Sequence, residues 1–93
     1  MNSHAIPLDF TELVDQRRGS VRARGHLTAQ AADLLRGTVL ALHGGGHPRV
    51  VVDLGDVDDA DEAGLATLEA VRTAVARDGG TLLVLGGPGR TGR

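Results

Sequence analysis

The chain of 93 residues has no cysteine, no lysine and a single aromatic residue, Phe10. Without cysteine, disulfide scaffolds, cysteine-bearing zinc sites and thiol nucleophiles are excluded. Without lysine, the chain has neither a Schiff-base amine nor the phosphate-binding lysine of a P-loop. One aromatic ring cannot build a base-stacking platform or an aromatic cage. These absences leave few chemistries open to the chain.

An excess of charge of one sign is also missing. Ten arginines stand against twelve acidic residues, which gives a formal net charge of −2, so no basic excess attracts nucleic acid or an anionic membrane. No apolar run approaches the ~18 residues of a membrane span. Residues 1–9 lack the basic and apolar stretches of a signal peptide. We therefore expect one small cytoplasmic domain that needs no cofactor, binds no nucleic acid and does not insert directly into a membrane.

What is present is a clear order of hydrophobic periods. Residues 10–14 favour a short strand, and residues 20–27 alternate between apolar and polar side chains as a half-exposed strand does. A turn between them predicts an antiparallel pair. Residues 29–42 then follow a helical period, with Thr28 placed to cap the helix.

The second half of the chain predicts a parallel crossover unit. Residues 50–54 are apolar on both faces of a strand, which is typical of a central parallel strand covered on both sides. Residues 61–78 predict a helix, and residues 81–85 predict a further strand; the crossover between the strands should be right-handed. The apolar face of this helix is expected to comprise Leu65, Leu68, Val71 and Val75. The predicted fold class is α/β, with a mixed sheet of about four strands and the order β-β-α-β-α-β.

An acidic run is the densest chemical feature. It holds six of the twelve acids, from Asp53 to Glu62, with no basic residue among them. A calcium loop needs a glycine where Asp61 stands, so we expect no metal site. We interpret the acids as solvated loop residues, two of which gain about 0.3–1 kcal/mol each from the dipole of a following helix. This interpretation leaves the surplus of acids unexplained.

Two glycine-rich segments are similar to catalytic motifs but lack the required partners. The run from His43 to His47 looks like the oxyanion segment of lipases, yet no G-x-S-x-G nucleophile exists in the chain. Its three glycines offer no helical face that could fix two histidine metal ligands. Residues 87–92 have P-loop spacing, but Arg93 stands where lysine is needed. We interpret the first segment as a solvated loop and the second as a loose tail.

Residues 49–70 resemble the core of the STAS domain family, which includes the bacterial anti-sigma factor antagonists. In that family a D-S-S-G-L or D-[ST]-x-G-L motif opens the second helix, and here residues 61–65 read D-E-A-G-L. Residues 25–28, G-H-L-T, stand where G-E-L-D is usual, and residues 78–84 look like the family's helix end and next strand. The resemblance implies a STAS-like domain over residues 8–86, an N-terminal extension over 1–7 and a loose Gly-rich tail over 87–93.

The chain departs from the family pattern at two places. The phosphorylated serine or threonine aligns with Glu62, so no hydroxyl remains at the switch position. The family's last helices and strand are missing, so the chain is either a minimal member or has a sheet face that something else covers. Glu62 is either a fixed mimic of the phosphorylated state or an ordinary first-turn glutamate. Gly64 serves either the approach of a partner's backbone or close packing of helix on sheet.

The resemblance implies a protein-interaction module and not an enzyme. The implied role is that of an anti-sigma factor antagonist in partner switching, a form of transcription regulation, with an anti-sigma factor or kinase-like protein as partner. The alternative is an accessory subunit that docks on the ATPase of a membrane ABC transporter of the lipid type, and a homodimer is a third prediction. The implied partner-binding residues are Asp58, Asp59, Asp61, Glu62, Ala63, Gly64 and Leu65, with Glu62 as the phosphosite equivalent.

Overall fold

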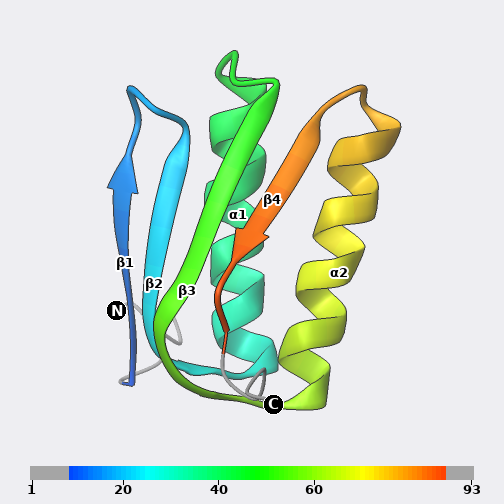
Figure 1. Cartoon of the computed structure of the whole chain (residues 1–93). Helices are drawn as coiled ribbons and strands as arrows, with labels where there is room; N and C mark the ends of the chain where they lie inside the picture. The colour runs from blue at the N-terminus through cyan, green and yellow to red at the C-terminus, as the bar shows by residue number, and fades with distance from the viewer. Residues whose placement is uncertain (1–8, 88–93) are drawn as a thin grey trace, which may run out of the picture.

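The computed structural model describes residues 9–87. The predicted extension over residues 1–7, and all but the first residue of the predicted tail, lie outside this part of the chain. The elements follow the order β-β-α-β-α-β that the sequence predicts (Figure 1). They are β1 (Phe10–Asp15), β2 (Ser20–Leu27), α1 (Ala29–Gly44), β3 (Arg49–Ala60), α2 (Glu62–Arg77) and β4 (Thr81–Leu85).

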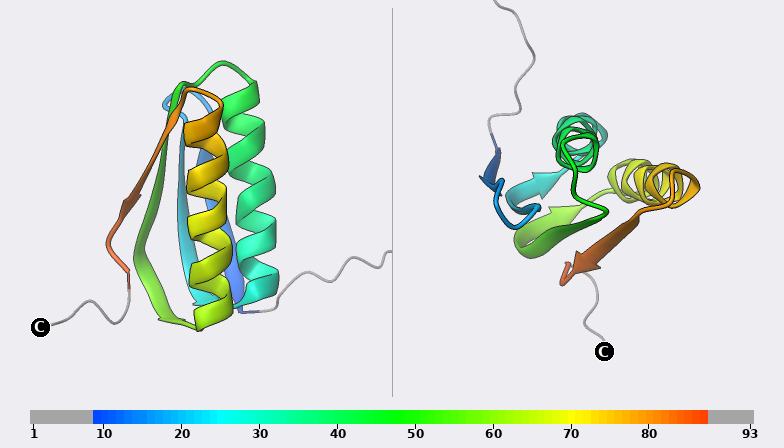
Figure 2. Two further views of the ribbon diagram at one scale, coloured as in Figure 1. Left: turned by 90° about the vertical axis from the view of Figure 1, so that its right-hand side faces the viewer. Right: turned by 90° about the horizontal axis from the view of Figure 1, so that it is seen from above.

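The strands form one sheet in the order β1-β2-β3-β4. β1 pairs antiparallel with β2, whereas β2 with β3 and β3 with β4 are parallel pairs, so the sheet is mixed as predicted. Both crossovers, through α1 and through α2, are right-handed and advance the sheet in the same direction (Figure 1). Two successive right-handed crossovers in one direction place both helices on one face of the sheet, as Figure 2 shows.

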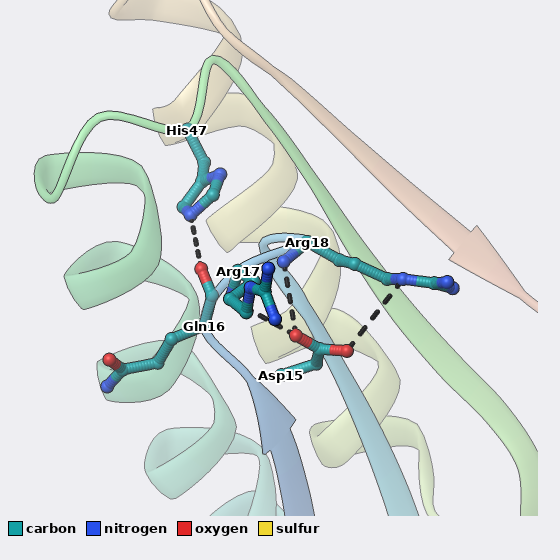
Figure 3. Close-up of polar contacts among 5 residues, drawn as sticks. All are labelled: Asp15, Gln16, Arg17, Arg18 and His47. Atoms are coloured by element: carbon teal, nitrogen blue, oxygen red, sulfur yellow. Dashed lines mark hydrogen bonds and ion pairs between the residues drawn. The ribbon is translucent and has the colours of Figure 1, made fainter.

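Local side-chain chemistry fixes the turn between β1 and β2. The carboxylate of Asp15 accepts hydrogen bonds from the backbone N–H groups of Arg17 and Arg18 at 3.1 and 3.2 Å (Figure 3). Gly19 ends the turn with φ +68°, a conformation that glycine adopts without steric cost. Such Asx-type bonding closes a turn because it replaces the water that would otherwise solvate the exposed N–H groups.

The hydrophobic core lies between the sheet and the helix layer. Inward-facing apolar residues of β2 alternate with outward-facing polar residues, whereas the outward-facing residues of β3 include Val51 as well as acids. Each helix contributes one apolar stripe. Thr28 caps α1 as predicted, because its hydroxyl accepts from the N–H of Ala31 at 3.1 Å. The largest fully buried side chains are those of Val21, Leu27, Leu35, Val39, Val50, Val52 and Val75.

The prediction that the central strand is covered on both sides is wrong. Val50 and Val52 are fully buried against the helices, whereas Val51 is only partly buried and Leu83, beside it on β4, is 40% exposed. The sequence shows that both faces of the strand are apolar, but the handedness of the crossovers leaves one face of the sheet without a helix. Within residues 9–87, nothing packs over that second face (Figure 2).

The prediction that Leu65 lies on the buried face of α2 is also wrong, because this residue is 45% exposed. Gly64 occupies the inward position at the start of the helix, and successive helical residues are turned by about 100°. Leu65 is therefore rotated away from the sheet. The buried stripe is Gly64, Leu68, Val71 and Val75.

Candidate functional site

Four of the six acids of the run lie in β3 and not in a loop, which corrects that part of the interpretation, whereas Asp61 and Glu62 lie at the start of α2 as predicted. β3 continues to Ala60 because all of β2 pairs with it, and the last register pair joins Leu27 to Ala60. Asp56, Asp58 and Asp59 are thus strand residues near the carboxyl end of β3. A strand that pairs on one side holds these carboxylates in fixed positions, as a loop would not.

Basic side chains from β2 account for part of the acidic surplus. Arg22 lies between two carboxylates, with Nε 3.5 Å from Asp53 Oδ2 and Nη1 3.7 Å from Asp56 Oδ2. Further along the same two strands, His26 Nδ1 is 3.9 Å from Asp59 Oδ2. The alternation of β2 predicts that its basic residues share a face. The sequence does not show that this face lies beside the acids, because the pairing joins positions some 30 residues apart.

The start of α2 is a locally rigid structure. Asp61 is the N-cap, and its carboxylate accepts a hydrogen bond from the N–H of Gly64 at 2.8 Å. The N–H of Leu65 donates to the backbone carbonyl of Asp61 at 3.1 Å. Glu62 follows the cap in the first turn, exposed, where the helix dipole favours its negative charge.

Gly64 is explained by packing. It is buried, and a Cβ atom at this position would overlap the carbonyl oxygen of Leu27 and lie 3.0 Å from that of Thr28. The N–H of Asp61 donates to the same Leu27 carbonyl at 3.1 Å. The start of α2 is therefore held directly on the junction between β2 and α1, and the close approach is made by the chain's own backbone.

Six of the seven predicted partner-binding residues are exposed, and we call the segment that they span, from the end of β3 into the first turn of α2, the α2-start surface. Its exposed members are Asp58, Asp59, Asp61, Glu62, Ala63 and Leu65, whereas Gly64 lies beneath them. The surface offers carboxylates around one exposed leucine. Its members include no hydroxyl or thiol side chain, and residues 9–87 hold no group of three or more acids and histidines arranged to bind a metal ion.

The interpretation of the segment from His43 to His47 as a solvated loop is only partly right. Gly45, Gly46 and His47 lie in the connection between α1 and β3, but both histidines are partly buried and hydrogen-bonded. His43 lies in the last turn of α1, with Nδ1 3.0 Å from the His47 carbonyl oxygen and Nε2 2.9 Å from Asp78 Oδ2. His47 Nε2 lies 2.6 Å from the carbonyl oxygen of Gln16 in the β1–β2 turn (Figure 3). The two rings tie together the end of the molecule opposite the α2-start surface (Figure 1). No sequence pattern predicts these contacts, because two of the acceptors, Gln16 and Asp78, are distant from the histidines along the chain.

The fold is an α/β domain in which both helices cover one face of a four-stranded mixed sheet (Figure 2). The protein-family model described as "Mlab, STAS domain" matches residues 12–92. The chain therefore belongs to the STAS domain family, and it is a STAS-type interaction module. A search of the curated proteins finds no match to the chain. Within the described residues, neither helix is long and apolar enough to cross a membrane.

Proposed function

We propose that the chain is a non-enzymatic cytoplasmic module that binds a protein partner through the α2-start surface. The observation that carries the proposal is the exposure of Leu65, at 45%, on a helix start that a cap and a buried glycine hold in place. Apolar contact area on a rigid frame costs little conformational entropy on binding, which is typical of interaction surfaces. A partner then gains contact with Leu65 without reorganising the domain.

The charges around Leu65 indicate the chemistry of the partner. Asp58, Asp59 and Glu62 are exposed acids of the same segment, and they suit a partner that carries arginine or lysine. Such charges set the rate of encounter and the choice of partner more than the affinity. We propose that the partner presents a basic rim around an apolar contact.

The first candidate for this partner is an anti-sigma factor or kinase-like protein of a partner-switching network. A phosphorylated serine would add about −1.5 to −2 charges at the start of α2. Glu62 adds one permanent negative charge at the aligned position, and no kinase can remove or increase it. On this proposal the chain is a regulator whose partner choice is fixed and corresponds to that of the phosphorylated state.

The second candidate is the ATPase of a lipid-type membrane ABC transporter, on which the chain would dock as an accessory subunit. Small STAS subunits of such systems carry a similar D-T-x-G-L motif, and residues 61–65 differ from it only at Glu62. The description of the matching family names Mlab and no anti-sigma factor antagonist, which keeps this candidate beside the first. Both candidates use the same surface.

Binding measurements with purified partners test the proposal. The anti-sigma kinases and ABC ATPases of the source genome are each titrated with wild type, Leu65→Ser and Glu62→Ser. We expect one class to bind wild type, and Leu65→Ser to weaken that binding at least about tenfold, as for a central apolar contact. The matched control is Leu34→Ser, since Leu34 is 40% exposed and belongs to α1, not to the α2-start surface.

The outcomes test the docking site and the role of Glu62 separately. Equal loss of binding in Leu65→Ser and Leu34→Ser, or no loss in either, would contradict the α2-start surface as the docking site. Tight binding of wild type to a kinase that Glu62→Ser leaves unchanged would contradict the role of Glu62 as a phosphomimic while leaving the interaction module intact. Gain of kinase binding in Glu62→Ser would support the first candidate.

A further inference from the structure

The face of the sheet opposite the helices, which we call the open face, carries a row of four outward-facing residues in register. Leu13 on β1 lies beside Arg22 on β2, Arg22 beside Asp53 on β3, and Asp53 beside Leu85 on β4. All four line one shallow hollow of about 530 Å³ on this face. Across the sheet the row therefore reads apolar, positive, negative, apolar.

The charge pattern repeats along the strands. Beyond the pair of Arg22 and Asp53, the register places Arg24 beside Asp56 and then His26 beside Asp59. In each of the three rows the basic residue is on β2 and the acid on β3. The open face thus has a basic stripe and an acidic stripe side by side.

This pattern is complementary to itself under one symmetry operation. A two-fold axis that runs parallel to the strands, between β2 and β3, lays β2 of one copy over β3 of a second copy. Arg22 then faces the second copy's Asp53, and Leu13 faces the second copy's Leu85. A two-fold axis across the strands would instead lay β2 over β2 and set arginine against arginine, which costs free energy. The charge pattern therefore selects both a second copy and its orientation.

In the single chain these groups gain little from one another. The ion pair of Arg22 and Asp53 is open to water, with the two side chains 56% and 34% exposed, and pairs of this kind contribute about 0–1 kcal/mol. Leu13 is 72% exposed and Leu85 is 49% exposed, so apolar area at both margins remains in contact with water. A second copy would cover both leucines and surround every charge with charges of opposite sign.

We propose that the open face is the interface of a homodimer in which two sheets pack face to face about this axis. Packed sheets lie ~10 Å apart with their strands within about 30° of one another, a spacing that two layers of side chains fill. The face measures about 26 Å along β2 by 19 Å across the strands, or ~500 Å². Because standard interfaces bury about 800 Å² per partner, the dimer is reversible and depends on concentration.

Sedimentation equilibrium of the full chain tests the dimer, read by interference optics because the chain has no tryptophan or tyrosine. Wild type is expected to pass from monomer to dimer as its concentration rises. Arg22→Asp makes both charged residues of the row acidic, and Asp53→Arg makes both basic. Like charges then face one another across the axis, so each variant alone should dimerise at least about tenfold more weakly. An equal mixture of the two variants restores opposite charges across the axis and should recover dimerisation as a heterodimer.

The mixture is the decisive arm, because a merely structural effect of either substitution would not be reversed by a second chain. Arg36→Asp is the matched control: Arg36 is 55% exposed, paired with Asp33 on α1, and lies outside the open face. Far-UV circular dichroism checks that each variant is folded.

Wild type that stays monomeric at every concentration overturns the proposal and leaves the face to a different partner. A dimer that survives both substitutions, or folded variants that do not recover on mixing, also overturns it. Asp59 belongs to both the open face and the α2-start surface, but the two substituted residues, Arg22 and Asp53, lie outside the α2-start surface, so docking there is tested separately.

Discussion

The imidazole of His43 joins the ends of the two helices, with Nε2 2.9 Å from Asp78 Oδ2 and Nδ1 3.0 Å from the His47 carbonyl oxygen. A carbonyl oxygen and a carboxylate both only accept hydrogen bonds, so both ring nitrogens donate. Only the protonated imidazolium has two donors. The backbone hydrogen bond to His47, followed by the contact with Asp78, accordingly raises the pKa of His43 above its ordinary 6.5.

A raised pKa in the folded state makes the contribution of His43 depend on pH. The stabilisation is complete below pH 6.5, the pKa of the unfolded chain, and is lost as the pH rises through the higher pKa of the folded chain. We expect His43→Gln to lower the free energy of unfolding more at about pH 5.5 than at about pH 8.5. Urea denaturation followed by far-UV circular dichroism at both values measures this difference.

Asp78→Asn serves as the companion variant, because it removes the negative charge and keeps the size of the side chain. In this background the effect of His43→Gln on the free energy of unfolding should differ less between the two pH values, since the Coulombic attraction of Asp78, one of the causes of the raised pKa, is gone. An equal effect of His43→Gln at acid and alkaline pH would contradict an imidazolium at this position.

Gly64→Ala tests the contact between α2 and the end of β2. Alanine improves helix propensity by about 1 kcal/mol over glycine. The added Cβ would overlap the carbonyl oxygen of Leu27, however, and forced shifts in a packed region cost about 1–3 kcal/mol. We expect a net loss of stability in urea denaturation. Gly37→Ala on α1 is the control, because its Cβ meets nothing within 4 Å and should stabilise; stabilisation by both changes would show that the contact is not tight.

Asp61→Ala removes the cap of α2. The carboxylate that accepts from the Gly64 N–H is lost, and such losses cost about 0.5–2 kcal/mol. Asp61→Asn keeps an oxygen acceptor and should retain most of the stability while removing one negative charge. Chemical denaturation of the two variants separates the cap from the charge. If both lose stability equally, the hydrogen bond is not what matters at this residue.

Leu68→Ala and Leu65→Ala probe neighbouring turns of the same helix. Leu68 is 4% exposed, so truncation leaves a cavity and should cost about 2–5 kcal/mol. Leu65 is 45% exposed, and a surface substitution of this kind usually changes stability by less than about 0.5 kcal/mol. The comparison is made by urea denaturation. A large loss from Leu65→Ala would place that side chain in the core and remove the apolar contact on which the docking proposal rests.

Local patterns were sufficient for the elements and their order. The alternation of residues 20–27 and the helical stripe that includes Leu35 and Val39 depend on near neighbours in the chain, and both were predicted correctly. Four residues of the α2-start surface, Asp61, Glu62, Ala63 and Leu65, come from the motif at 61–65, and their role in binding stays a prediction. The exposure of Leu65 could not be predicted from the sequence, because an apolar residue next to the buried stripe of a helix looks the same in the sequence as a core residue.

The sequence by itself determined an α/β chain with capped helices and an acidic segment, because propensity, periodicity and caps act between residues a few positions apart. Only the tertiary structure decided what lies beside that segment. The register of β2 on β3 sets Arg22 next to Asp53, and the packing of both helices on one face leaves the other open. These relationships depend on crossover handedness and strand pairing over some 30 residues, which no local pattern encodes.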